Sequence, residues 1–199
     1  MSGNDIKYYV ELFQLLFLDF LGRKLKKREC ILKGGCNFRF FFRSIRYSEN
    51  IDLDVKNVTV NKLEDIVASI LDSQPFAQIL AVHGLSIKKW SSPEQTETTQ
   101  RWKLLLGAEN ISMPINTKIE FSRRESEETT AFESVDPLLI RKYSLTPFMC
   151  MHYTAEAAYR QKLEALITRA VTQARDIFDL HFLLSSGVKP SLKNFCYKN

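Results

Sequence analysis

The sequence predicts an α+β fold, with strands and helices alternating in the N-terminal part and helices forming the C-terminal part. Three observations lead to this prediction. Apolar residues recur at helical spacing in 5–21 and again in 61–72. The segments 30–33 and 50–55 have the short apolar or alternating patterns of strands. A run rich in Ala, Glu and Leu over 153–170 is typical of a helix.

Composition indicates a folded chain with a basic surface. Of its 199 residues, 45% are hydrophobic, including 14 Phe, which is ample for a packed core. Charged residues make up 26%, which argues against disorder. The net charge of +5 favours polyanionic partners, a class that includes both nucleotides and RNA.

Several classes of protein are excluded by the spacing of particular residues. The cysteines lie among apolar residues without the spacing of zinc ligands, so we expect reduced thiols: Cys30, Cys36, Cys150 and Cys196. The three histidines are too far apart in sequence to form a ligand pair. Glu11 and Asp19 interrupt the apolar N-terminal run, and no stretch is long enough to span a bilayer. We therefore expect a cytoplasmic protein without a membrane partner.

The N-terminal helix, over 5–21, is expected to pack against the core. Asn4 or Asp5 could cap its start, and Gly22 fits its end. The basic run over 23–28 leads into the first strand, where it could contact a nucleic-acid backbone or form a solvated loop.

A glycine pair interrupts the apolar strand 30–33 and precedes a Phe-rich helix over 37–45. Gly34 and Gly35 remove two side chains, so backbone N–H groups could approach a phosphate at the helix N-terminus. Arg39, about one turn along, could reach back toward that phosphate. Ser48 could bind a triphosphate oxygen or close a turn.

The strand 50–55 carries a pair of carboxylates. Asp52 and Asp54 point to one side, and Leu53 and Val55 to the other. Two neighbouring carboxylates repel each other unless a cation lies between them, and oxygen ligands suit Mg²⁺, which keeps substrate phosphates in its remaining positions. A Gly-Gly turn alone, or Asp-x-Asp alone, is common in ordinary proteins. Together they predict the front half of a nucleotidyl-transfer site.

The central part of the chain is expected to add strands to the sheet. Its expected elements, in order, are a helix over 61–72 capped by Asn61, one or two strands over 78–90 with a bend at His83-Gly84, a loop over 91–100, strands over 101–107 and 115–122, and a strand or turn over 132–140.

Two helices are expected near the C-terminus. Thr154 caps the first, over 153–170, and Lys162 on its face is a point charge suited to a triphosphate. The second, over 173–185, carries Asp176 and Asp179 on one face. Taken alone, Lys162 and Asp176 are more typical of ordinary charges on a helix surface.

At these residues the chain resembles the AbiEii/AbiGii toxin family of nucleotidyltransferases, within the DNA polymerase β-like superfamily. The segments carrying the resemblance are Lys33-Gly-Gly-x-x-x-Arg39, Arg46-Tyr-Ser-Glu-Asn-Ile-Asp52-Leu-Asp54, Gln161-Lys162-Leu-Glu-Ala-Leu and Arg175-Asp176-Ile-Phe-Asp179-Leu. It covers roughly 32–184. The chain departs from the family at Asn50, where many members carry an acid.

The resemblance implies a polymerase β-like mixed-sheet core with flanking helices over 1–145, and a helical segment over 146–199 that completes the active-site cleft. It implies that Mg²⁺ or Mn²⁺ is held by Asp52, Asp54 and a third acid on a neighbouring strand, for which Glu120 is the candidate. A surface Glu paired with Arg or Lys is the other interpretation of Glu120. The residues that the resemblance implies for nucleotide binding are Lys33, Gly34, Gly35, Arg39, Ser48 and Lys162. Asp176 would act as a base or orient phosphate-binding groups, and Asp179 would anchor its helix.

The function implied is Mg²⁺-dependent transfer of a nucleoside monophosphate from an NTP to an RNA (tRNA) or protein hydroxyl, by the toxin of a bacterial toxin–antitoxin or phage-defence pair. The partners implied are an NTP, that acceptor and an antitoxin protein. Two alternatives remain: a catalytically silent nucleotide- or RNA-binding module, which Asn50 would fit, and a protein that docks an antitoxin. Family members commonly continue into a further helical segment, so we expect a truncated form or fragment.

Overall fold

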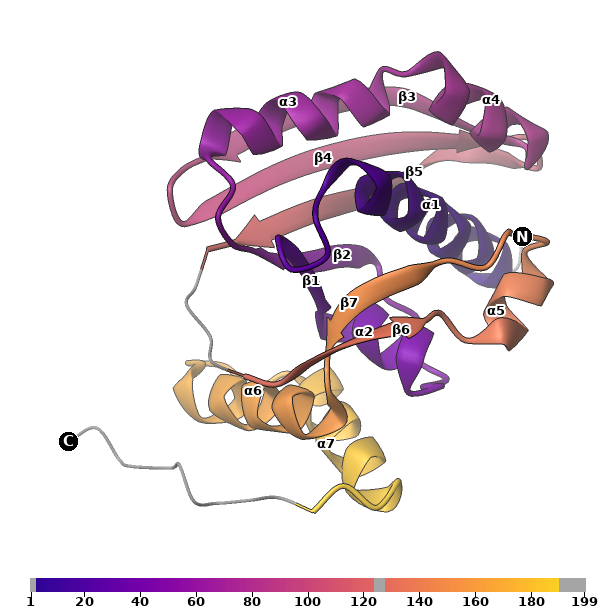
Figure 1. Cartoon of the computed structure of the whole chain (residues 1–199). Coiled ribbons are helices and arrows are strands. Elements are labelled where there is room, and N and C mark those ends of the chain that lie inside the picture. Colours follow the sequence, from indigo (N-terminus) through magenta and orange to yellow (C-terminus); the bar gives the residue numbers. More distant parts are fainter. Residues whose placement is uncertain (1–2, 124–127, 190–199) are drawn as a thin grey trace.

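The computed structural model describes residues 3–123 and 128–189, and within them one mixed sheet of seven strands joins most of the chain (Figure 1). The strand order is β3-β4-β5-β2-β1-β7-β6. The strands are β1 (Cys30–Lys33), β2 (Asn50–Val55), β3 (Leu85–Gln95), β4 (Thr99–Ala108), β5 (Ile111–Ser122), β6 (Thr130–Ser134) and β7 (Met149–Tyr153). The predicted α+β mixed-sheet fold is confirmed.

Helices flank this sheet and extend beyond it. They are α1 (Gly3–Lys24), α2 (Gly34–Phe41), α3 (Val60–Leu71), α4 (Gln74–Val82), α5 (Pro137–Lys142), α6 (Ala155–Thr168) and α7 (Ala174–Ser185). Among the described residues, no helix is both long enough and apolar enough to cross a membrane.

The helix α1 forms the centre of the main core. Its 22 residues include Phe13 and Phe17, both fully buried, and the ring of Phe13 lies 6.1 Å from that of Phe76 in α4. From the sheet, Leu53 and Val55 of β2 contribute to the same core. One face of the sheet is therefore apolar and helix-covered, as the alternation in β2 predicts.

The strand β2 lies between β1, which is antiparallel to it, and β5, which is parallel. This register places Asp52 directly opposite Lys33 on one side and Glu120 on the other. The sheet thus aligns charged residues from three strands that are far apart in sequence.

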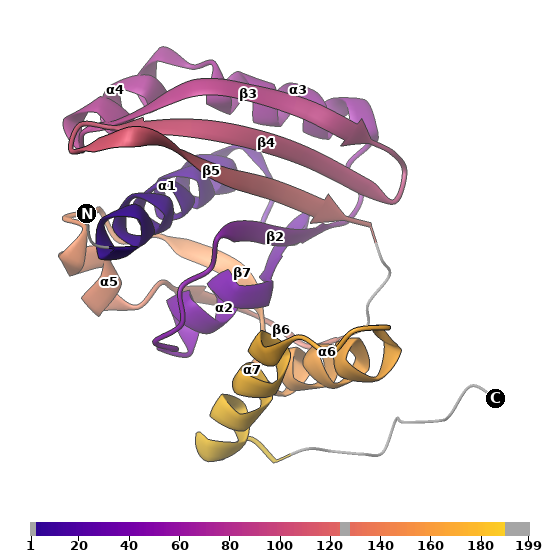
Figure 2. The same cartoon turned by 180° about the vertical axis from the view of Figure 1, so that it is seen from behind.

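The helices α6 and α7 pack together at the end of the molecule away from α3 and α4 (Figures 1 and 2). Phe38 of α2 is buried with Ala158 of α6 and Leu183 of α7, so the outer side of α2 holds the helical pair. The Thr154 side chain accepts a hydrogen bond from the Ala157 N–H, which confirms the predicted cap. Because β7 belongs to the sheet, the helical segment begins at Ala155, later than the predicted boundary at residue 146.

The prediction of strands from residue 78 was wrong, because α4 occupies Gln74–Val82. Ser73 caps this helix by accepting a hydrogen bond from the Phe76 N–H, and Pro75 lies in its first turn, where its missing N–H costs nothing. The cap and the proline together mark a helix start. A bend at His83-Gly84 was correct, since Gly84 has φ +70° and β3 begins directly after it.

Other boundaries differ as well. The predicted loop over 91–100 is largely strand, because β3 continues to Gln95 and β4 starts at Thr99. Cross-strand pairing with β4 compensates for the polar composition of that segment. Helix α3 is capped by Thr59, not Asn61, and α1 continues through Gly22 to Lys24. Helix α2 starts at the glycine pair itself, and β7 was not predicted.

Replacing Phe13 with alanine should destabilise the fold by about 3–5 kcal/mol, because it opens a cavity in a fully buried aromatic cluster. Ile6→Ala in the same helix is the matched control: its side chain is 45% exposed, and we expect a change of about 0.5 kcal/mol or less. Urea unfolding measures both. Equal losses in the two variants would contradict this account of the core.

Candidate functional site

The Gly-Gly turn packs directly against the acidic strand. Gly34 has φ +64°, and a Cβ there would lie 2.7 Å from the Asp52 Oδ2. A Cβ on Gly35 would lie 2.8 Å from the Ser48 Oγ. Both positions therefore require glycine. Lys33 is the N-cap residue of α2, and its side chain makes no capping hydrogen bond. The first N–H groups of the helix can therefore donate to another acceptor, and a helix N-terminus favours an anion.

Asp52 is a carboxylate without a hydrogen-bond donor among the described residues. Burial raises its pKa, and the facing Glu120 raises the pKa further. Lys118, Lys33 and Lys162 act against this rise, so the ammonium of Lys162 on α6 lies within electrostatic reach of the strand. A carboxylate whose pKa is raised, and which faces a second carboxylate, indicates a position that a cation would stabilise.

Asp54 has a different environment, because both of its carboxylate oxygens accept hydrogen bonds. Its Oδ1 accepts from the Lys33 Nζ at 2.5 Å and from the Ser122 Oγ at 3.1 Å. Its Oδ2 accepts from the Tyr153 hydroxyl at 2.6 Å. The side chain is only 4% exposed.

Glu120 lies beside Asp52 but has cationic partners of its own. The Arg101 Nε donates to its Oε2 at 2.9 Å, and the Lys118 Nζ lies 3.2 Å from the same oxygen. Burial raises the Glu120 pKa, but the hydrogen bonds from these two cations outweigh burial and hold the pKa below its usual value. Glu120 therefore shows both features considered from the sequence: it pairs with Arg and Lys, and it lies next to Asp52.

The predicted metal ligands are not all available. Within 3–123 and 128–189, no group of three or more His, Cys, Asp or Glu side chains is arranged to hold a metal ion. Asp52 has no competing donor among the described residues, and the in-register Glu120 accepts from Arg101 and Lys118 through Oε2 alone, which leaves its Oε1, so this pair fits one divalent ion. Asp54 does not fit in the same way, because Lys33, Ser122 and Tyr153 already use its oxygens.

The helical segment supplies a network of paired charges. The Lys162 Nζ lies 2.9 Å from the Asp176 Oδ1 and 2.7 Å from the Asp179 Oδ2. Arg169 also pairs with Asp176. Arg46, just before β2, donates from its Nε to the Asp179 Oδ1 at 2.9 Å and from its Nη2 to the Oδ2 at 2.7 Å. Asp179 is fully buried, so it joins α6, α7 and the segment before β2.

Two predicted phosphate-binding residues have internal partners here. The Arg39 guanidinium pairs with Glu11 of α1, at 2.5 Å between Nε and Oε1, and donates to the Ser44 carbonyl at 2.9 Å. The Ser48 Oγ donates to the Asn50 carbonyl oxygen at 2.9 Å, closing the turn before β2. Asn50 itself lies in register with Lys118 of β5.

Sequence reasoning missed Tyr153, Ser122 and the bidentate role of Arg46. Tyr153 lies at the end of β7, and its contact with Asp54 could be inferred only once that strand was placed beside β1. Arg46 opens the second segment of the resemblance, and that position was the available signal for it.

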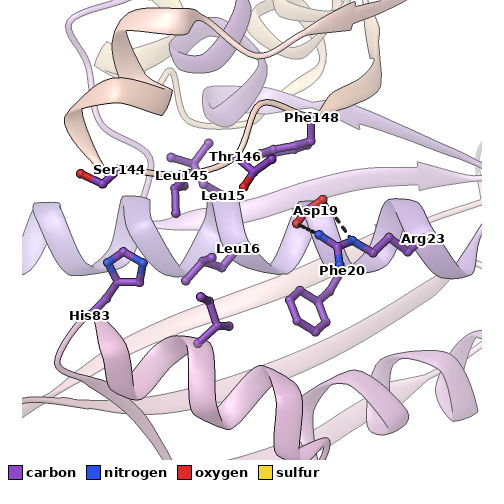
Figure 3. A pocket seen from close by; sticks show the side chains of 11 residues that line it. Leu15, Leu16, Asp19, Phe20, Arg23, His83, Ser144, Leu145, Thr146 and Phe148 are labelled. Carbon is purple, nitrogen blue, oxygen red and sulfur yellow. Dashed lines mark hydrogen bonds and ion pairs between the residues drawn. The ribbon is translucent and has the colours of Figure 1, made fainter.

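A separate pocket, of about 230 Å³, lies between α1, α4 and residues 144–148 (Figure 3). Leu15, Leu16 and Phe20 line it, and the Asp19–Arg23 ion pair lies at its side. None of the predicted site residues lines it, so it is distinct from the candidate site.

Comparisons with known proteins agree with this architecture. Residues 16–196 match the family described as nucleotidyl transferase AbiEii toxin of a type IV toxin–antitoxin system. Among solved structures, JHP933 from Helicobacter pylori is similar, with TM-score 0.64 and 19% identity over 93% of this chain and 68% of that chain. MenT4, a nucleotidyltransferase toxin from Mycobacterium tuberculosis, has TM-score 0.68 and 19% identity over 92% of this chain and 59% of that one. At these identities the structural likeness shows the fold alone. A comparison with curated proteins finds no match.

Gly34→Ala should destabilise the protein more than Gly187→Ala. Both glycines have positive φ, so both variants incur backbone strain of about 1–2 kcal/mol. Only at Gly34 does the new Cβ also clash with Asp52, whereas nothing lies within 4 Å of that position at Gly187. Urea unfolding of the two variants isolates the clash. Equal losses would show that the turn does not press on Asp52.

Asp179→Ala should cost about 3–5 kcal/mol, because it leaves Arg46 and Lys162 near a buried position without their shared carboxylate. Asp19→Ala provides the control, since it removes the partner of the exposed Arg23, and such surface pairs contribute about 0–1 kcal/mol. Thermal unfolding compares the two. A loss at Asp179 as small as the loss at Asp19 would argue against the bridging role.

Proposed function

The chain belongs to the AbiEii nucleotidyl transferase toxin family, and from this membership and the geometry of the site we propose that it transfers a nucleoside monophosphate from an NTP to a hydroxyl in a Mg²⁺-dependent reaction. The proposed acceptor is an RNA end, with tRNA first, and a protein hydroxyl second. The proposed protein partner is an antitoxin, as expected for the toxin of such a pair.

One observation carries this proposal. The carboxylate of Asp52, which accepts no hydrogen bond from the described residues, lies between the Gly34 turn and Glu120, and the positive charge of Lys162 acts on it. Nucleotidyl transfer needs mainly positioning and neutralisation of charge, and no covalent nucleophile. An isolated surface aspartate would not need Gly34 to make room for it. The arrangement therefore supports a site that binds a cation and phosphates together.

Each residue has a task that follows from its position. The N–H groups at the start of α2 would bind triphosphate oxygens beside Ser48 and the glycine pair. Lys162 would neutralise phosphate charge, and Asp176 would orient its ammonium through the 2.9 Å contact. Asp52 and Glu120 would hold Mg²⁺, which when bound polarises the phosphoryl oxygens and aligns the α-phosphorus for in-line attack. Asp179 would keep α7 and Arg46 in place.

Asn50 favours a second candidate function, a nucleotide- or RNA-binding module without turnover. Asn50 lies two residues before Asp52 on the same face of β2, so an amide occupies a place where a carboxylate could have joined the ion site. An amide oxygen can still coordinate Mg²⁺, but it adds no negative charge. Binding of nucleotide without transfer would distinguish this candidate.

The direct test is transfer of label from α-³²P-NTPs to total tRNA in Mg²⁺, with a chelator as control. Asp52→Asn should lower the rate by about 100-fold or more, because it removes charge that no other described side chain replaces. Asp65→Asn, an exposed position on α3, should leave the rate unchanged. Label transfer that survives Asp52→Asn would refute the proposed site. Nucleotide binding without any transfer would favour the silent module.

A further inference from the structure

A site that uses two divalent ions needs carboxylate oxygens open toward both. In such sites the ions lie about 3.5–4 Å apart and share the acidic ligands between them. On β2 the candidates are Asp52 and Asp54, which lie on the same face of the strand. Their surroundings differ, and the difference bears on the number of ions that the site can hold.

Asp54 already has a cation. The Lys33 Nζ lies 2.5 Å from its Oδ1 and 2.5 Å from the Ser122 Oγ, which itself donates to Asp54. The Tyr153 hydroxyl binds the other carboxylate oxygen at 2.6 Å. The Lys33 side chain is 23% exposed and that of Asp54 is 4% exposed, so the pair is largely shielded from water. Opening a shielded, hydrogen-bonded ion pair is costly, and an incoming ion would have to meet that cost.

The register of the sheet explains why Lys33 reaches this position. Lys33 is directly opposite Asp52 on the neighbouring antiparallel strand, and its long side chain extends diagonally to Asp54. Its ammonium is therefore fixed beside Asp54, and its positive charge also acts against the rise in the pKa of Asp52. Asp52 keeps its own oxygens free of donors among the described residues. It faces Glu120, which accepts from Arg101 and Lys118 through Oε2 alone and keeps its Oε1, whereas both oxygens of Asp54 are used.

We propose that the site holds one divalent ion, on Asp52 and Glu120, and that the ammonium of Lys33 occupies the place of a second ion beside Asp54. Unlike a metal ion, the Lys33 ammonium is a fixed positive charge that cannot coordinate or exchange ligands. Asp54 is then a positioning residue, which Ser122 and Tyr153 keep aimed at Lys33, and not a metal ligand. This inference rests on the proposed function, and it specifies which cations balance the negative charge of the carboxylates at that site.

The test counts bound Mn²⁺ on the full chain by the electron paramagnetic resonance signal of the free ion, with Mn²⁺ alone as the probe. The wild type should bind one ion per chain. Asp52→Asn should weaken this binding by about 10-fold or more, whereas Asp54→Asn should leave it within about twofold. Lys33→Met, which removes the ammonium and frees Asp54, should raise the count to two, and Lys33→Arg should keep it at one.

The double variant Lys33→Met/Asp54→Asn is the control for loss of folding in the single variants. It replaces both members of the ion pair by neutral side chains of similar size, so neither charge is left buried without its partner. It should bind one ion with wild-type affinity. Two ions on the wild type, or a 10-fold weakening in Asp54→Asn or in the double variant, would overturn the inference, as would no bound Mn²⁺. Label transfer by the wild type is scored separately, so two bound ions together with active transfer would reject this inference alone.

Discussion

The buried carboxylate of Asp179 is the contact on which the rest of the site depends. It binds Arg46, which immediately precedes the acidic strand, and Lys162, which belongs to the helical segment. Without it, mainly the apolar clusters around Phe38 and Ala157 would hold α6 and α7 against the sheet. Apolar packing fixes proximity but little orientation, whereas a bidentate arginine fixes both. The direction in which Lys162 faces is therefore set by Asp179 and Asp176.

A second constraint comes from the sheet. The register of β1, β2 and β5 places Lys33, Asp52 and Glu120 side by side, and the next row holds Asp54 beside Ser122. Along this row the two adjacent acids, Glu120 and Asp52, are flanked by the cations Arg101 and Lys33, so the face has no large excess of either sign. The opposite face is apolar and packs on α1, which leaves the polar face as the place for ligands.

Most of the elements that carry the predicted site residues were predictable from sequence, whereas β7, which supplies Tyr153 to Asp54, was not. The strand 30–33, the glycine pair, the strand 50–55 and Thr154 as a helix cap each have a local signal that the structure follows. The helix Gln74–Val82 was missed because apolar residues suggested strands and the Ser73 cap was not recognised. The polar ends of β3 and β4 depend on each other for pairing, which no local pattern reveals. For the site, residue types were predictable but partners were not: the contact of Tyr153 with Asp54 and that of Arg39 with Glu11 depend on tertiary packing.

The central claim is that the acidic strand and the α6 lysine face one bound nucleotide. A crystal structure with Mn²⁺ and an α,β-methylene nucleoside triphosphate, using the anomalous signal of manganese, tests it most directly. The account predicts a manganese peak beside Asp52 and a phosphate oxygen within about 3 Å of the Lys162 Nζ. A nucleotide bound instead in the pocket beside Leu16 and Phe20, with Lys162 still held by Asp176 and Asp179 away from any phosphate, would contradict it.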